Sequence, residues 1–153
     1  VNGLVGSEMC IRDRNNIGCE KILNRDEFLE GGVRALDKTQ FGGGVDTVGG
    51  EILAKILSQT AQKGSIACCG NVAGASFETS VFPFILRGVS LLGIDSAESS
   101  IDLKQHLWDK LADEWKLDLS EQTKVIELAE LDSEIERILN GLQLGRVVIK
   151  HGE

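Results

Sequence analysis

The residues best placed for chemistry lie in two short polar stretches, each expected to end a buried strand. Residues 46–48 (DTV) close one apolar run before Gly49 and Gly50, and residues 69–71 (CGN) close another. Ligands of open parallel α/β sheets bind at the carboxyl ends of the strands. If the flanking segments form such a sheet, the polar groups of these two stretches are the first candidates for a binding site.

The segment between the two stretches predicts the sheet. Four apolar residues recur there at helical spacing: Ile52, Leu53, Ile56 and Leu57. Lys63 and Gly64 end this helix, and residues 65–69 form the second strand. A strand, a helix and a strand within fewer than thirty residues make a βαβ unit. Such a unit implies a parallel sheet with right-handed crossovers and an α/β fold class.

Further strands are expected on both sides of this unit, at residues 20–23, 89–94, 124–128 and 146–150. The first fourteen residues carry neither helical nor strand periodicity. Because SEMCIRDR within them looks like translated adaptor sequence, we exclude this segment from the expected fold.

Two short helices are expected from their caps. Ser80 is a suitable N-cap for a helix that ends before Gly88, where a left-handed residue is favoured. Ser133 and Glu136 have the spacing of a capping box, which predicts a second helix ending at Asn140.

The longest expected helix begins at Ser99 or Ser100 and ends near Lys116. Three leucines recur along it every four residues, with two tryptophans beside them: Leu103, Leu107, Leu111, Trp108 and Trp115. This spacing is typical of a helix face that packs in a core, and we expect the tryptophans to be core residues rather than a binding platform.

Composition and charge argue against several classes of partner. The formal net charge of −8 disfavours nucleic acid and anionic membranes. No apolar run approaches the ~20 residues of a membrane helix, and the first residues lack a secretory signal pattern. The cysteines show no spacing that suits zinc, so free thiols in a reducing cytoplasm are expected. They are Cys10, Cys19, Cys68 and Cys69.

Several motifs that would indicate an active site are absent from the sequence. It contains no GxGxxG, GxxxxGK[ST], HExxH or GxSxG. His106 and His151 lie far apart, without a paired cysteine or carboxylate pattern. We therefore predict no catalytic residue and no metal site in this chain.

Four motifs resemble, in the same order, one family of enzymes. They are VDTVGGEILAKIL, ACCGNVAG, VFPFILRGVSLLGIDS and NGLQLGRVVIK. From about Gly18 to Lys150, the chain is similar to the C-terminal half of the acrylyl-CoA reductase branch of the medium-chain dehydrogenase/reductases. These are zinc-independent, NADPH-dependent, quinone oxidoreductase-like enzymes.

The resemblance implies a partial Rossmann fold. This would be a doubly wound parallel sheet lacking its first βαβ unit, followed by a C-terminal helix and strand that return to a missing GroES-like domain. The implied domains are residues 15–123, an incomplete NADP-binding domain, and residues 124–153, a return segment of the catalytic domain. Residues 1–14 would be a non-native segment.

The resemblance also implies five NADPH contacts. Arg25 matches an arginine beside the adenosine 2′-phosphate, and its donors suit a phosphate dianion. The backbone of Asn71 would approach the nicotinamide riboside, Ile85 would pack near the nicotinamide, and Ser96 would hold the carboxamide. Arg146 would reach the cofactor from the returning strand. Without the resemblance, Arg25 is a surface partner of an adjacent carboxylate, Ile85 is a core residue and Arg146 leads an edge strand.

The implied activity is NADPH-dependent reduction of the C=C bond of acrylyl-CoA, a small-molecule acyl-CoA substrate. The implied parent is a cytoplasmic homodimer without nucleic-acid or membrane partners, and the chain by itself is expected to be inactive. Two alternatives stay open: an NADPH quinone oxidoreductase, and a non-catalytic α/β binding module.

Overall fold

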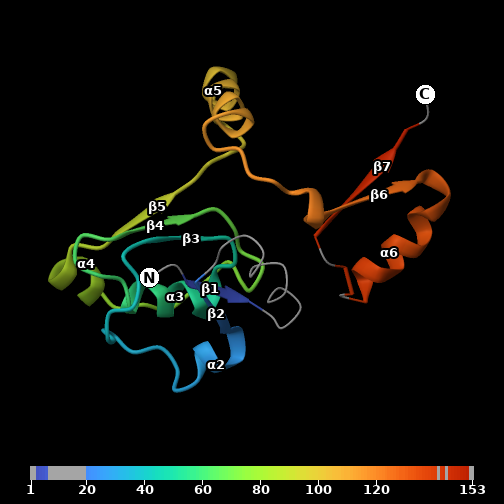
Figure 1. The fold of residues 1–153 in the computed structure, drawn as a ribbon. Helices are drawn as coiled ribbons and strands as arrows, with labels where there is room; N and C mark the ends of the chain where they lie inside the picture. Colours follow the sequence, from blue (N-terminus) through green and yellow to red (C-terminus); the bar gives the residue numbers. More distant parts are fainter. Residues whose placement is uncertain (1–2, 7–19, 141, 144, 152–153) are drawn as a thin grey trace. The chain divides into compact units, whose positions relative to one another are not determined.

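The computed structural model describes residues 3–6, 20–140, 142–143 and 145–151 (Figure 1). This part of the chain divides after Ser99 into two compact units. Of the described residues, unit 1 holds 3–5 and 20–99, which include a three-stranded parallel sheet, and unit 2 holds Gly6 and the residues from Ser100 onward. None of the helices among the described residues combines the length and the hydropathy needed to cross a bilayer.

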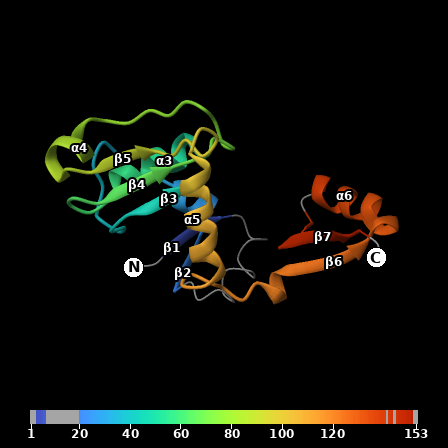
Figure 2. The ribbon, with the colours of Figure 1, turned by 90° about the horizontal axis from the view of Figure 1, so that it is seen from above.

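The sheet of unit 1 confirms the expected βαβ unit and extends it by one strand. Its strands are β3 (Gly44–Asp46), β4 (Ser65–Cys68) and β5 (Ser90–Gly93), and they lie parallel in the order β3-β4-β5 (Figure 2). Asp46 pairs with Cys68, and Cys68 pairs with Gly93. The last residues of all three strands therefore lie side by side at one edge, the carboxyl edge.

Helix α3 (Gly50–Ser58) connects β3 to β4 and supplies half of the buried hydrophobic residues described in unit 1. Leu53 and Leu57 pack with Ile66 of β4 and with Val89 in one buried cluster. Phe28, Phe41 and Ile52 form a second buried cluster. The four apolar residues expected on one face of this helix therefore do face the protein interior, with Ile56 partly buried against both clusters.

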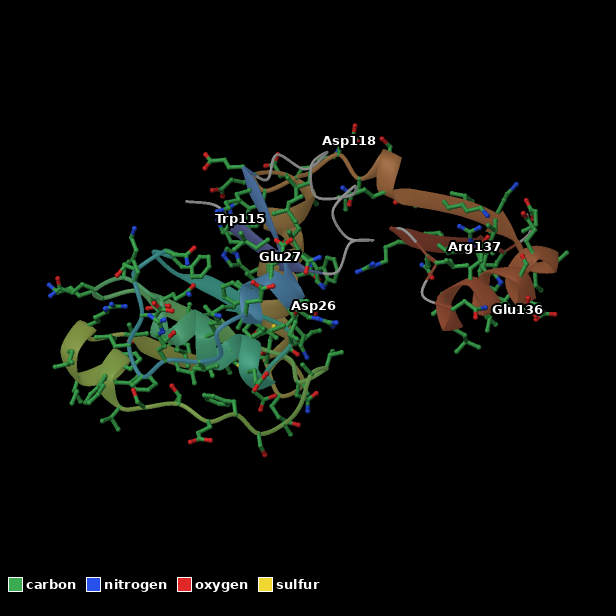
Figure 3. All side chains as sticks on the ribbon, turned by 90° about the horizontal axis from the view of Figure 1, so that it is seen from below. Asp26, Glu27, Trp115, Asp118, Glu136 and Arg137 are labelled. Carbon is green, nitrogen blue, oxygen red and sulfur yellow. The ribbon has the colours of Figure 1, made fainter. Side chains whose placement is uncertain are left out.

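Two shorter segments complete the amino-terminal part of unit 1. β2 (Lys21–Asn24) runs directly into α2 (Arg25–Leu29), whose N-cap Asn24 accepts hydrogen bonds from the N–H groups of Asp26 and Glu27 (Figure 3). β2 pairs with β1 (Gly3–Gly6). The segment that we excluded from the expected fold therefore contributes one strand, because pairing with β2 does not require the periodicity that identifies a strand in sequence.

Helix α4 (Phe82–Arg87) begins one residue later than expected. Val81 is its N-cap, whereas the Ser80 hydroxyl donates to the Ala35 carbonyl at 2.7 Å and accepts from the Phe82 N–H at 3.2 Å. Ser80 therefore connects two loops in addition to supporting the helix start. The C-terminal prediction is confirmed, since Gly88 has φ 61° in the left-handed region.

Unit 2 contains a second parallel βαβ unit. Its elements are β6 (Thr123–Glu127), α6 (Leu131–Leu139) and β7 (Arg146–Lys150). Ile126 of β6 is buried, and so is Glu134 of α6. The Glu134 carboxylate pairs with Lys124 of β6 and, at 3.6 Å, with Arg137.

The expected capping box of this helix is wrong. Ser133 lies inside α6, where its hydroxyl donates to the Glu130 carbonyl at 2.8 Å. The capping box lies six residues earlier, between Glu127 and Glu130, and it opens the 3-10 turn Leu128–Glu130 that leads into α6. The helix ends at Asn140, as expected.

Helix α5 (Ile101–Ala112) has the expected cap but not the expected burial. Ser100 accepts the Leu103 N–H at 3.2 Å, and the helix ends four residues before Lys116. Trp108 is 68% exposed, and no residue of α5 is buried among the described residues. The core assignment of the two tryptophans is therefore wrong for this structure, because helical spacing identifies an apolar face but not the surface that covers it.

Candidate functional site

The carboxyl edge of the three-stranded sheet places both polar stretches of the sequence side by side. Beyond the last strand residues, the Cys69 N–H donates to the Asp46 carbonyl at 2.8 Å, and the Ile94 N–H donates to the Cys68 carbonyl at 2.9 Å. The loops that follow β4 and β5 therefore leave the sheet from neighbouring positions. This is the edge at which parallel α/β sheets bind ligands.

A buried carboxylate organises the turn between β3 and α3. Asp46 is 2% exposed, and both of its side-chain oxygens accept the Gly49 N–H, at 3.1 and 3.0 Å. The Val48 N–H lies 3.4 Å from Oδ1, and the Cys68 thiol donates to Oδ2 at 3.5 Å. The carboxylate thus takes the place of a side-chain N-cap for α3 and lies where the helix dipole favours negative charge.

This turn interlocks with the loop after β4, which we call loop 70–74. Gly49 has φ 72°, and a Cβ there would lie 2.6 Å from the Gly74 carbonyl oxygen. A Cβ at Gly70 would lie 2.0 Å from the Thr47 carbonyl oxygen. The Ala73 N–H donates to a carbonyl of the turn, that of Val48, at 2.8 Å. Glycine is therefore required on both sides of this contact.

An open hollow of about 660 Å³ lies at the same edge. Its lining comes from the ends of β4 and β5 and the loops that follow them: Cys68, Cys69, Gly70, Asn71, Gly93, Ile94 and Asp95. A Cβ at Gly93 would meet no atom within 4 Å, so the β5 side of the hollow has room for a planar group. The Asp95 carboxylate accepts the Glu98 N–H at 3.1 Å and so shapes the loop after β5.

The two thiols at this edge differ in environment. Burial raises the pKa of Cys68, and both the hydrogen bond to Asp46 and the negative charge of that carboxylate raise it further. Cys69 is exposed, and its thiol donates to the Asp46 carbonyl at 3.5 Å. Among the described residues, no group of three or more histidine, cysteine and carboxylate side chains could hold a metal ion.

Two of the five predicted contacts lie at this edge or in the loop that leaves it, and a third lies on α4. Asn71 lines the hollow, and Ser96 follows Asp95 in the loop after β5. Ile85 lies on α4, whose Arg87 carbonyl accepts the Lys63 N–H just before β4, and the Ile85 side chain is 68% exposed in this structure. An exposed isoleucine on a helix is available to pack against a ligand or another part of the protein.

The two predicted arginines lie at the starts of α2 and β7. Arg25 begins α2, and its Nε donates to Asp26 Oδ1 at 3.2 Å on the surface of unit 1. That pair is the one expected if Arg25 has no ligand. Arg146 begins β7 in unit 2, where it pairs in register with Thr123 and donates to the Gly145 carbonyl at 3.0 Å. Within unit 1, the structure therefore groups Asn71 with the Ser96 loop, and Arg25 is not among the residues that line the hollow.

Asp46 is the residue that the sequence reasoning missed. It lay within a candidate stretch but was not assigned a role. The available signal was an aspartate at a strand end with a glycine pair three residues later, in Asp46, Gly49 and Gly50. This spacing lets a strand-end carboxylate cap the following helix through a left-handed glycine.

The described residues fit one half of a dinucleotide better than the other. The hollow beside Gly93 has space for a ring. The N-terminus of α3 does not suit a pyrophosphate, since the Asp46 carboxylate already binds the Gly49 N–H and the Ala73–Gly74 backbone covers the two glycines. A second anion there would be repelled by that charge. The edge therefore has room for a ring of a dinucleotide but does not suit its pyrophosphate.

Sequence comparison finds relatives that match most of the chain. The YhfP protein of Bacillus subtilis, named as a quinone oxidoreductase, is 37% identical over 136 residues, which is 88% of this chain and 41% of the relative. The acrylyl-CoA reductase AcuI of Ruegeria pomeroyi is 36% identical over 135 residues, again 88% and 41%. The chain thus spans about two fifths of the length of these relatives. No family model matches the chain.

Solved structures show the same similarity. The yhdH oxidoreductase of Salmonella enterica, crystallised with NADP, superposes with a TM-score of 0.86 at 33% identity, over 98% of this chain and 46% of that one. The yhfP protein of Bacillus subtilis, crystallised with NAD, superposes with a TM-score of 0.85 at 34% identity, over 96% and 45%. The parallel sheet is thus part of a Rossmann domain, and structural neighbours bind nicotinamide dinucleotides. The chain therefore belongs to the medium-chain dehydrogenase/reductases, as a stretch homologous to about two fifths of their quinone oxidoreductase-like and acrylyl-CoA reductase-like members.

Proposed function

We propose that the chain is part of an NADPH-dependent oxidoreductase and that unit 1 supplies the edge facing the nicotinamide. The observation that carries this proposal is the hollow at the carboxyl edge, lined by Asn71 and bounded by the open side of Gly93. Relatives crystallised with NADP and NAD support it.

Each predicted contact has a defined task in this proposal. NADPH, when bound, supplies the hydride. The Asn71 backbone and the Ser96 hydroxyl hold the riboside and the carboxamide, so that one face of the ring is presented to the substrate. Ile85 excludes water from the ring. Arg25 exchanges its surface partner Asp26 for the 2′-phosphate, and Arg146 adds a second cationic contact.

For the substrate, we propose an α,β-unsaturated acyl-CoA, with acrylyl-CoA reduced to propionyl-CoA. The similarity to an acrylyl-CoA reductase supports this substrate. A quinone is the second candidate, supported by the similarity to a protein named as a quinone oxidoreductase. Both substrates accept a hydride at carbon conjugated to a carbonyl, so the described edge serves either reaction.

The test uses the gene product read at full length from its locus. NADPH oxidation is followed by absorbance with acrylyl-CoA, with a quinone and with neither. We expect turnover with acrylyl-CoA above turnover with the quinone. The reverse order would favour the quinone oxidoreductase, and NADPH binding without turnover on either would favour a non-catalytic binding module. Failure to bind NADPH at all would refute the proposal.

We also propose that residues 15–123 act as the NADP-binding domain and residues 124–153 as the segment that returns to a catalytic domain. The separate β6–α6–β7 unit supports a distinct C-terminal segment, although the compact division falls earlier, after Ser99. The parent is proposed to be a cytoplasmic homodimer. Limited proteolysis and light scattering of the full-length product test the boundary and the dimer.

A further inference from the structure

We propose that Asp46 is the positioning residue of the carboxyl edge. Its buried carboxylate holds the turn 46–50 in the one conformation on which loop 70–74 docks, and it thereby fixes the Asn71 backbone that faces the nicotinamide. This assignment rests on the proposed function, because the role of the loop toward the cofactor is part of that function. Asp46 acts through the loop and does not touch the cofactor.

The buried charge of Asp46 and the turn 46–50 require each other. A buried carboxylate is tolerated only when hydrogen bonds compensate the loss of water. The donors for Asp46 are the N–H groups of Gly49 and Val48 and the thiol of Cys68. Two of these donors belong to the turn itself. An unfolded turn would leave the buried charge without them.

The turn also determines the position of loop 70–74. The Val48 carbonyl accepts the Ala73 N–H at 2.8 Å. The Gly74 carbonyl oxygen lies only 2.6 Å from the position that a Cβ at Gly49 would occupy. The backbone of Asp46 contributes as well, because its carbonyl accepts the Cys69 N–H at 2.8 Å. A change in φ at Gly49 therefore displaces the loop that carries Asn71.

Asp46→Asn tests this coupling with a side chain of the same size. The amide has one acceptor oxygen in place of two, and its NH₂ group cannot accept from Gly49 or from the Cys68 thiol. We expect the Kd for NADPH of the full-length gene product to rise roughly tenfold, because the loop that carries Asn71 is held by fewer hydrogen bonds and must then be ordered when NADPH binds.

Two readouts need no cofactor. In Asp46→Asn, hydrogen exchange at the Ala73 and Cys69 amides should become faster while exchange in the β4 interior is retained. Alkylation of Cys68 should also become faster, because the carboxylate that raises its pKa is gone. A role in overall stability alone would instead raise exchange throughout unit 1.

Asp37→Asn is the matched control. Asp37 is also a hydrogen-bonded carboxylate of unit 1, but its partners are the Lys38 N–H and Gln59, which do not line the hollow. We expect this variant to lose stability while its Kd for NADPH and its exchange at Ala73 stay unchanged.

The outcomes separate the two levels of the proposal. Unchanged exchange at Ala73 in Asp46→Asn would overturn the positioning role even if the wild-type protein binds NADPH. An equal rise in Kd in Asp46→Asn and Asp37→Asn would overturn it too, because that result indicates general destabilisation. A wild-type protein that does not bind NADPH would overturn the proposed function and with it the cofactor role of the loop, whatever the exchange data show.

Discussion

Replacing Gly70 by alanine should destabilise unit 1 more than any other single methyl group added at the carboxyl edge. The new Cβ would lie 2.0 Å from the Thr47 carbonyl oxygen and 2.5 Å from its carbon, both backbone atoms. Relief requires a separation of the two segments by about 1 Å, since real Cβ contacts below 3.0 Å are essentially absent from proteins.

The magnitude follows from what that separation breaks. The two hydrogen bonds that join these segments, from Cys69 to Asp46 and from Ala73 to Val48, contribute about 0.5–1.5 kcal/mol each. Overpacking strain adds about 1–3 kcal/mol. The expected loss in the free energy of unfolding is therefore about 2–6 kcal/mol, which is a large part of the ~5–15 kcal/mol typical of a domain.

Urea unfolding of the full-length gene product, followed by circular dichroism, measures this loss. Gly93→Ala is the control on the same edge, because a Cβ there meets no atom within 4 Å. Alanine in a strand should raise the free energy of unfolding by about 0.5–1 kcal/mol relative to glycine. If Gly70→Ala is as stable as Gly93→Ala, the close backbone contact between the turn and loop 70–74 does not constrain the protein as described.

Four further predictions test other parts of the structure. Arg87→Lys should lower the free energy of unfolding by about 2 kcal/mol in urea titrations, because one ammonium cannot replace a guanidinium that binds three backbone carbonyls; Arg87→Gln should be at least as damaging. Hydrogen bonds, first of all the one from the Lys38 N–H, lower the pKa of Asp37 in the folded protein. Its contribution to stability is therefore present above its unfolded pKa and is lost as the pH falls through the folded pKa. In Asp37→Asn, the melting temperature should fall less steeply with decreasing pH over that range. Iodoacetamide should modify the exposed Cys69 before Cys68, because the raised pKa of Cys68 leaves less reactive thiolate. Mass spectrometry of the Cys68→Ser and Cys69→Ser variants measures the rate at each thiol, and faster modification of Cys68 would contradict this prediction. Arg25→Ala should weaken NADPH binding more than NADH binding, and equal losses in titrations would contradict the phosphate contact.

Local patterns were sufficient for most of the secondary structure. The period of the apolar residues in α3 and the glycine breaks on either side predicted the βαβ unit, and β7 has the expected bounds. Gly88 and Ser100 were correct as caps because a cap acts within one turn of its own helix. These features depend on residues that are neighbours along the chain.

The errors share a different physical origin. Ser133 had the spacing of a capping box, but Glu127 and Glu130 form one earlier in the chain, and the Ser133 hydroxyl donates to the Glu130 carbonyl inside α6 instead. Trp108 had core spacing but is exposed, because burial depends on which surface arrives from elsewhere. The phosphate contact of Arg25 is a different case: it stays a prediction, and in this structure the guanidinium pairs with Asp26.

By itself, the sequence determined the α/β class, the order of the elements and the two stretches that end β3 and β4. Each of these depends on periodicity and on glycine positions within a few residues. Only the tertiary structure decided that Asp46 is buried against Cys68 and that Gly70 lies against Thr47. Those contacts join residues more than twenty positions apart, and they form because parallel pairing brings the ends of β3 and β4 into register. No local pattern encodes that distance, which is why the residue that organises the edge was found only in the folded chain.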